Sequence, residues 1–429
     1  MDTERTVVSD IRTALTGACA VVREGLAADA VAGIVPAFVA SPASTEEASA
    51  LLRAAAAHDL AVVPRGAGTG LGWGLPGSRC DLVVDMQAMD QVLEHAAGDL
   101  VVRVQAGVTI GQLASVLARA GQQLALDVPA EATVGGMVST GTAGPRRFRY
   151  GAPRDLLIGI TAVRADGVVA HAGGKVVKNV AGYDIGKLLA GSQGTLALIT
   201  EATFRLHPVP PAAAWVTAEF GPEDRAAAAA AVAAAAGSVL VPSAVELDWP
   251  GSRLRVGVLL EGTAAGVADR VKQMSSLLFT DASPTMAVAD APVRWWDQLP
   301  ASGAPAVVVR VTFWVSALAG VLEAVAAAAS GAGVQPTVCG AAGAGLLYAR
   351  LDGLDGLDPG TGIQQAAQFV ATLRERVAGP RGGVVVLAAP AEMAASAYAE
   401  VPGAALMRAV KDQFDPGDRM FPGRMAGVI

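Results

Sequence analysis

The chain has 429 residues, of which 52% are hydrophobic, 4% aromatic and 17% charged. This length predicts two or three domains. The formal net charge of -7 argues against nucleic acid as a partner, because phosphate backbones are bound by clustered lysine and arginine.

The three cysteines, Cys19, Cys80 and Cys339, lie far apart in the sequence. They are too few to hold an iron–sulfur cluster on this chain alone, and we expect buried thiols in a reducing compartment. The N-terminal segment MDTERTVVSD lacks the basic start and apolar run of a secretory signal. These features predict a cytoplasmic protein.

Short strands and helices alternate over the first part of the chain. After a helical opening, SPASTEEASALLRAAAAHDL (41–60) predicts a helix, since Ser or Thr can cap it and Glu46 and Glu47 fall in its first turn. Strands are expected in AVVP (61–64), CDLVVDM (80–86), LVVRVQAGVTI (100–110) and QQLAL (122–126), with a helix over 111–121. This order predicts an α/β or α+β domain.

The pattern changes past HPVPP (207–211). Strands in 213–220, 244–248, 253–262 and 304–316 are separated by alanine-rich helical stretches, which predicts an antiparallel sheet backed by helices in a second domain. The segment 226–245 carries no charge and is long enough to cross a membrane. Its alanine content and the interruptions at Gly237 and Pro242 instead favour a packed alanine-rich helix, so we expect no transmembrane segment. We interpret LDGLDGLDPGTG (351–362) as a surface loop rather than a calcium site.

One loop is unusually rich in glycine. PRGAGTGLGWG (Pro64–Gly74) has glycine at every second position from Gly66, and such a run indicates unusual φ angles or the close approach of another molecule. A phosphate cradle is the first candidate. The loop nevertheless fits neither the GxGxxG nor the GxxxxGK pattern.

Four stretches, in order and spacing, resemble the flavin-binding domain of the vanillyl-alcohol oxidase superfamily. They are VVPRGAGTG, VQAGVTIGQL, ATVGGMVSTGTAGPRRFRYGAPRDLLIG and AGYDIGKLLAGSQGTLALIT. Within that superfamily, GPRR (144–147), KVVKNVAGYD (175–184) and the tail with its DP and PGR motifs are similar to the FAD-binding subunit of bacterial glycolate oxidase.

The resemblance implies an α+β fold, with a p-cresol methylhydroxylase (PCMH)-type FAD-binding domain of two α/β subdomains and a C-terminal cap domain with an antiparallel sheet backed by helices. It places the FAD-binding domain in 1–210, the cap domain in 211–400 and a tail that returns to the FAD domain in 401–429.

The resemblance also assigns the glycine loop to the FAD pyrophosphate, which its backbone N–H groups would bind. TVGG (133–136) would pass close to the ribityl chain and pyrophosphate, with RYG (149–151) after it, and Gly194, Thr195 and Ile199 would line the adenine or isoalloxazine. The implied FAD-binding residues are Pro64, Arg65, Gly66, Ala67, Gly68, Thr69, Gly70, Thr133, Val134, Gly135, Gly136, Ser139, Gly141, Arg149, Tyr150, Gly151, Gly194, Thr195 and Ile199.

The sequence departs from the resemblance at two places. Covalently flavinylated relatives carry a histidine where this chain has Thr69, so we expect FAD to be bound noncovalently. Phe421 replaces the usual asparagine before Pro-Gly-Arg, which removes a polar contact. The histidines are His58, His95, His171 and His207, and for His58 and His207 we expect packing roles.

The second domain has no histidine, because none follows His207. A histidine-based metal site of the kind found in related D-2-hydroxy-acid dehydrogenases is therefore excluded there, and we predict no metal. The resemblance then implies the FAD-binding electron-transfer subunit of a glycolate oxidase type complex. That complex would oxidise glycolate or another D-2-hydroxy acid, with a catalytic flavoprotein subunit and an iron–sulfur subunit as partners that could link it to a membrane.

Two other functions stay open. One is a stand-alone FAD-dependent dehydrogenase or oxidase of an alcohol, sugar or hydroxy acid, and the other is a flavin-free structural partner. No catalytic residue is identified. The candidates to bind a substrate carboxylate are in the second domain: Arg294, Trp295, Trp296 and Arg310. The candidates to approach the flavin are Lys178, Tyr183 and Asp184. For each of them the alternative is a packing role or contact with a partner subunit. The basic residues Arg146, Arg147, Arg149, Lys175, Lys178 and Lys187 predict either a solvated face or a docking surface.

Overall fold

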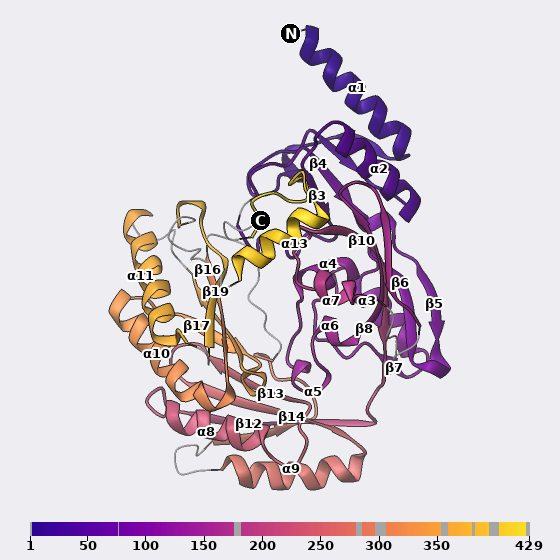
Figure 1. The fold of residues 1–429 in the computed structure, drawn as a ribbon. Coiled ribbons are helices and arrows are strands. Elements are labelled where there is room, and N and C mark those ends of the chain that lie inside the picture. The colour runs from indigo at the N-terminus through magenta and orange to yellow at the C-terminus, as the bar shows by residue number, and fades with distance from the viewer. Residues whose placement is uncertain are drawn as a thin grey trace. The chain divides into compact units, whose positions relative to one another are not determined.

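The fold is seen in a computed structural model that describes residues 2–75, 77–175, 182–279, 285–296, 306–352, 359–379, 382–393 and 403–425. The chain divides into two compact units, which Figure 1 colours along the sequence. The first unit comprises Met1–Thr142, Ala152–Val209 and Ala399–Ile429, and the second comprises Ala143–Gly151 and Pro210–Tyr398.

The boundary of the units differs from the predicted domains at residues 143–151. This segment belongs to the second unit, because Phe148 packs against the core of that unit. In addition, Arg149 Nη1 lies 3.5 Å from Ser243 Oγ, and the Tyr150 hydroxyl donates to Glu261 Oε2 at 3.1 Å. No local sequence pattern indicates that this segment belongs to the second unit, since its placement depends on contacts with residues far along the chain.

The first unit begins with a small sheet in the order β1-β2-β4-β3. Its strands are β1 (Val22–Glu24), β2 (Phe38–Ala40), β3 (Val62–Arg65) and β4 (Leu82–Asp85). The parallel strands β2, β4 and β3 are short runs of buried β-branched and aliphatic residues, as expected of strands covered on both faces. Helix α2 (Thr45–Ala57) precedes β3, and the Ser44 hydroxyl caps it by accepting the Glu47 N–H.

A second sheet in the first unit is antiparallel, in the order β5-β6-β10-β8-β9. Its strands are β5 (Val92–Ala96), β6 (Val101–Gln105), β8 (Leu157–Arg164), β9 (Val169–Gly173) and β10 (Ala197–Arg205). Helix α4 (Val134–Thr140) packs on β6 and β10. The predicted strand 122–126 is shortened to β7 (Gln122–Gln123), which pairs with β11 (His207–Pro208).

The remaining helices of the first unit are α1 (Asp2–Ala18), α3 (Ile110–Ala118), α6 (Pro153–Leu156), α7 (Ile185–Leu189) and α13 (Ala404–Phe414). A one-turn helix, α5 (Arg147–Tyr150), lies in the segment that joins the second unit.

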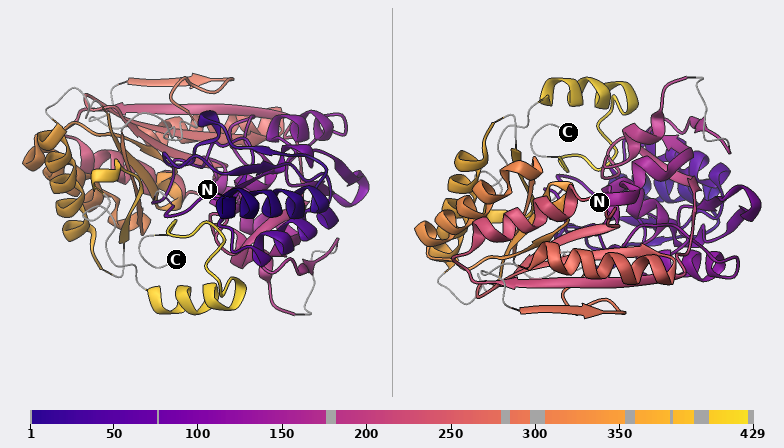
Figure 2. Two further views of the ribbon diagram at one scale, coloured as in Figure 1. Left: turned by 90° about the horizontal axis from the view of Figure 1, so that it is seen from above. Right: turned by 90° about the horizontal axis from the view of Figure 1, so that it is seen from below.

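The second unit is one antiparallel sheet in the order β15-β12-β14-β13-β17-β18-β16-β19. Its strands are β12 (Ala212–Phe220), β13 (Ala244–Trp249), β14 (Leu254–Gly262), β15 (Thr285–Ala289), β16 (Val307–Phe313), β17 (Thr337–Gly340), β18 (Leu346–Leu351) and β19 (Gly382–Ala388). Its helices are α8 (Arg225–Ala236), α9 (Ala264–Leu278), α10 (Leu318–Ala332) and α11 (Pro359–Val377). These helices lie along one face of the sheet (Figures 1 and 2), and their apolar residues share a core with alternate residues of the strands.

Two apolar segments of the second unit bear on the question of a membrane span. Residues 226–245 do not form one long helix, because α8 ends before Gly237, and Ala228 and Val232 lie in the core. Within the described residues, Val315–Ala332 is long and apolar enough to cross a membrane, by length and composition alone. Its residues Leu318, Leu322 and Val325 are buried in the sheet–helix core.

All three cysteines are free, with Cys19 and Cys80 buried and Cys339 half-buried. Burial raises the pKa of Cys80 to about 11 and that of Cys339 to about 12. The thiolate is therefore disfavoured at neutral pH, which fits the predicted packing role.

Candidate functional site

The glycine loop begins where β3 ends. Thr133 and the helix that follows it, α4, lie directly against this loop. A Cβ on Gly66 would lie 2.0 Å from Thr133 Oγ1, and a Cβ on Gly70 would lie 2.7 Å from Thr140 Cγ2. Gly68 has φ of +81°, a conformation that residues with a Cβ seldom adopt. The glycines thus allow a close approach of two loops that are far apart in the sequence.

The loop has backbone donors to offer. In the described part of the chain, the N–H groups of Ala67, Gly68 and Gly70 make no backbone hydrogen bond. Those of Val134 and Gly135 donate to Val108 O and Ala106 O at 2.9 and 2.8 Å. The 66–70 loop therefore supplies the donors for an anion, whereas the start of α4 supplies a surface that an extended ligand can approach closely.

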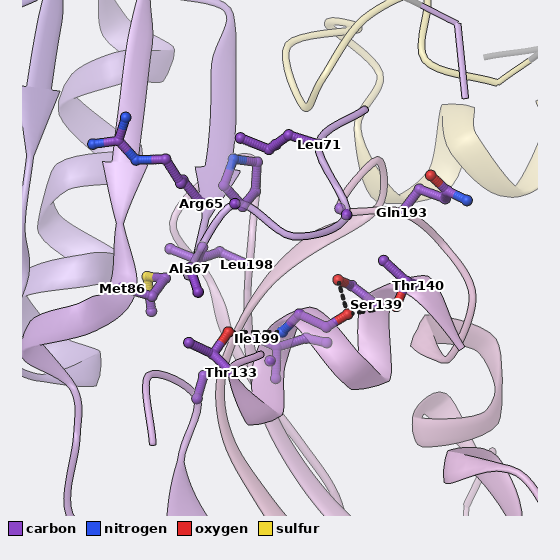
Figure 3. A pocket seen from close by; sticks show the side chains of 18 of the residues that line it. Arg65, Ala67, Leu71, Met86, Thr133, Ser139, Thr140, Gln193, Leu198 and Ile199 are labelled. Atoms are coloured by element: carbon purple, nitrogen blue, oxygen red, sulfur yellow. Dashed lines mark hydrogen bonds between the residues drawn. The ribbon is translucent and has the colours of Figure 1, made fainter. Parts of the chain in front are cut away.

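These segments surround a pocket in the first unit (Figure 3). Thirteen of the implied FAD-binding residues line it: Pro64, Arg65, Gly66, Ala67, Gly68, Thr69, Gly70, Thr133, Gly135, Gly136, Ser139, Gly194 and Ile199. Nine lining residues were not predicted: Leu71, Met86, Ala106, Thr140, Gln193, Ala197, Leu198, Phe421 and Arg424.

Six implied residues lie outside this lining. The side chains of Val134 and Thr195 are fully buried, and the Thr195 hydroxyl donates to Ser192 O at 2.7 Å. Gly141 ends α4 with φ of +68°. The other three, Arg149, Tyr150 and Gly151, belong to the second unit, and their role toward FAD stays a prediction.

The resemblance places Arg65 at the entrance of the FAD-binding loop, and in the structure its guanidinium is held by carboxylates. Its Nη1 lies 3.0 Å from Asp29 Oδ1 and its Nη2 lies 2.9 Å from Asp85 Oδ2. Arg23 also pairs with Asp29, at 2.6 Å, and holds the pKa of that carboxyl well below its usual range. The Arg65 side chain points away from Thr133 and Ser139 (Figure 3). The Arg65 ion pairs therefore connect the end of β3 to Asp29 and to Asp85 at the end of β4.

Arg424 holds the glycine loop from the other end of the chain. It is 3% exposed, and its guanidinium donates to Gly70 O and Leu71 O, both at 2.8 Å. Phe421 packs under the guanidinium, 4.6 Å from it. Of the described residues that line the cavity, the charged ones are Arg65 and Arg424, and none is a carboxylate.

The tail that carries Phe421 and Arg424 is anchored by Lys411 and Asp415, which are both buried. Lys411 Nζ donates to Asp415 Oδ2 at 2.8 Å, and to Thr195 O and Met420 O, each at 2.9 Å. Met420 also bridges to Val62 of β3. The only sequence signal for this wall was the PGR motif, which did not indicate which residues it contacts.

Other predicted candidates lie elsewhere. Arg294 is exposed, and Trp295 and Trp296 pack together over Gly257. Tyr183 is 95% exposed, and Asp184 caps α7 by accepting the Lys187 N–H at 3.1 Å. Lys178 lies outside the described residues.

The remaining basic and histidine candidates also have structural contacts. Lys175 and Lys187 pair with Glu94 and Asp184. His95 contacts Gln122 at 2.9 Å.

Comparison with known proteins identifies the cofactor. Residues 36–173 match the family model described as FAD binding domain. This chain binds FAD. D-lactate dehydrogenase of Archaeoglobus fulgidus is 42% identical over 171 residues, which are 40% of this chain and 38% of that protein. Glycolate oxidase subunit GlcD of Bacillus subtilis is 36% identical over 182 residues, which are 41% of this chain and 38% of that protein. The matched part spans less than two fifths of either relative.

A solved structure shows the fold of the whole chain. p-Cresol methylhydroxylase aligns with a TM-score of 0.74 and 15% identity over 98% of this chain and 96% of its own. The predicted PCMH-type α+β fold is therefore confirmed. The cavity also fits FAD, because glycines bring two loops together and N–H groups of the 66–70 loop make no backbone hydrogen bond. Among the described residues that line it, none is acidic.

Arg424 gives a first test of this cavity. Replacing Arg424 by glutamine should lower FAD affinity about tenfold to a hundredfold, because two charge-assisted hydrogen bonds that fix the loop are lost. FAD dissociation constants from flavin fluorescence would measure this change. Arg79→Gln is the control, since Arg79 is half-exposed and pairs with Asp59 and Asp81 outside the lining. Equal affinities for the two variants would contradict the role given to Arg424.

Proposed function

We propose that this chain is the FAD-binding electron-transfer subunit of a glycolate oxidase type complex. The complex would oxidise glycolate or another D-2-hydroxy acid to the 2-oxo acid. The observation that carries the proposal is an FAD cavity on a chain with no histidine after His207. Similarity to glycolate oxidase subunit GlcD and to a D-lactate dehydrogenase supports the substrate class.

We infer two partner subunits, because this chain has no histidine after His207 and too few cysteines for an iron–sulfur cluster. A second flavoprotein subunit would supply the substrate chemistry, and an iron–sulfur subunit would take the electrons onward. In this proposal 1–210 is the FAD-binding domain, 211–400 the cap domain that meets a substrate or partner, and 401–429 the returning tail. The protein would be cytoplasmic and would reach a membrane only through its partners.

FAD, when bound, supplies the redox step, and this chain's residues hold it. We infer noncovalent binding, because the described residues that line the cavity include no histidine, cysteine or tyrosine. The N–H groups of Ala67, Gly68 and Gly70 would bind the pyrophosphate, and Arg424 would keep their loop in place.

A second candidate function is a stand-alone dehydrogenase of a hydroxy acid. The observation that favours it is Arg310, a half-buried arginine of the second unit whose Nε is buried and has no hydrogen-bond partner among the described residues. An arginine of this kind could bind a substrate carboxylate.

Anaerobic flavin reduction separates the two functions. The purified FAD-loaded chain should keep its flavin oxidised when glycolate, D-lactate or D-2-hydroxyglutarate is added. Reduction should follow once the second flavoprotein subunit is present, and a mixture of that subunit with free FAD is the control. Rapid reduction of the chain alone would reject the electron-transfer role and favour the stand-alone enzyme.

A further inference from the structure

Phe421 has a backbone conformation that is rare for an aromatic residue. Its φ is +44°, in the left-handed region where the Cβ atom crowds the following carbonyl oxygen. Among the described non-glycine residues with positive φ it is the only aromatic one, and it is 2% exposed. Strain of this kind persists where surrounding contacts hold the residue, and it is concentrated at ligand-binding sites.

The backbone of the tail explains where this strained residue lies. β3 is an edge strand of its sheet, and the tail pairs with it. Val62 N–H donates to Arg419 O at 2.7 Å, and Phe421 N–H donates to Val62 O at 2.9 Å. Three residues later, Arg424 donates to Gly70 O at 2.8 Å. Phe421 therefore stands between the strand that leads into the glycine loop and the arginine that holds that loop.

The Phe421 ring connects the core of the small sheet to Arg424. The ring packs with Val63 and Cys80, and a Cβ on Gly77 would lie 2.9 Å from its Cε2 atom. The guanidinium carbon of Arg424 lies 4.6 Å from the centre of the ring, which is within the range of a cation–π contact. The ring thus joins a packed core to a side chain that lines the FAD cavity.

Packing alone does not account for a phenylalanine at position 421. Glycine adopts positive φ without steric cost, and asparagine does so more readily than phenylalanine, but neither offers an aromatic face to a guanidinium. An aliphatic side chain would fill the core and also leave the cation without a ring. The contribution that is specific to phenylalanine is its contact with Arg424.

We propose that Phe421 is a positioning residue for FAD binding, which holds the Arg424 guanidinium against the glycine loop. It acts through Arg424 and needs no contact with the cofactor. The proposal rests on the binding of FAD in this cavity, which Gly66→Ala tests separately. It does not depend on the substrate or the partner subunits proposed above.

A double-mutant cycle on the full chain tests this role. Phe421→Leu keeps an apolar side chain but removes the ring, so FAD affinity measured by flavin fluorescence should fall about fivefold to thirtyfold. In the Arg424→Gln background the same change should have little further effect, because two residues that act through one contact are not additive. Unchanged affinity of Phe421→Leu, or equal losses in both backgrounds, would overturn the proposal.

Val39→Ala is the control for core stability. Val39 belongs to the same core cluster as Phe421, is 1% exposed and is not among the described residues that line the cavity. Its truncation should lower the midpoint of urea unfolding and leave the FAD dissociation constant unchanged. If Val39→Ala weakens FAD binding as much as Phe421→Leu does, the effect belongs to core stability and the proposal fails.

Two smaller residues at position 421 separate the backbone from the ring. Phe421→Gly and Phe421→Ala both remove the ring and should weaken FAD binding alike. Because glycine accepts positive φ, the glycine variant should unfold at a higher urea concentration than the alanine variant, which reverses the usual order. A more stable alanine variant would contradict the strained conformation from which the proposal starts.

Discussion

Gly66→Ala should abolish stable FAD binding. The added Cβ would lie 2.0 Å from Thr133 Oγ1 and 3.1 Å from Thr133 Cβ, and Thr133 is buried at 2% exposure, so the glycine loop must move away from α4. Overpacking of this kind costs about 1 to 3 kcal/mol, and each charge-assisted hydrogen bond lost to the pyrophosphate adds about 1.5 to 3 kcal/mol. We expect FAD affinity to fall about a hundredfold or more.

The flavin content of the purified variant and its FAD dissociation constant measure this effect. Gly98→Ala is the matched control, because no atom lies within 4 Å of a Cβ at Gly98. Thr133→Ala in the Gly66→Ala background should recover part of the affinity, since it removes the hydroxyl that the new Cβ meets. Full FAD occupancy in the single variant would show that the loop does not hold the cofactor.

Lys411→Met should release the tail and with it a wall of the FAD cavity. The side chain of Lys411 is 4% exposed and that of Asp415 is 0% exposed. Without the lysine, the buried Asp415 carboxylate keeps the Met420 N–H as a donor but loses its counter-ion, and the carbonyls of Thr195 and Met420 lose the Nζ donor. Breaking one side of a buried ion pair costs about 3 to 5 kcal/mol. We expect lower unfolding free energy of the first unit and weaker FAD binding, since Phe421 and Arg424 follow this anchor.

Urea unfolding followed by flavin fluorescence would measure both consequences of Lys411→Met. Asp412→Asn is the control, because Asp412 is the exposed neighbour on the same helix. The pair Lys411→Met with Asp415→Leu should be more stable than Lys411→Met alone, as it leaves no lone buried charge. A Lys411→Met variant with native stability would mean that the tail is held by its backbone contacts with β3.

The sequence predicted the parts of the site that depend on local pattern. The glycines at 66, 68 and 70 indicate a backbone that another group approaches closely, and in the structure Thr133 of TVGG lies against Gly66. The ion pairs of Arg65 could not be predicted, because its carboxylate partners Asp29 and Asp85 come from separate segments. Arg424 was missed, since its hydrogen bonds reach 353 and 354 positions back along the chain. The assignment of residues 143–151 to the second compact unit also depends on contacts with distant residues.

The returning tail has a consequence for how the holoprotein is made. Arg424 closes the loop at Gly70 across 354 positions of sequence. At elongation rates of about 5 to 20 residues per second, roughly 20 to 70 s separate the synthesis of these two walls. During that interval the glycine loop of a nascent chain lacks its hydrogen bonds to Arg424. Tight binding of the flavin is therefore a late event of biogenesis, which follows the emergence of the final helix from the ribosome.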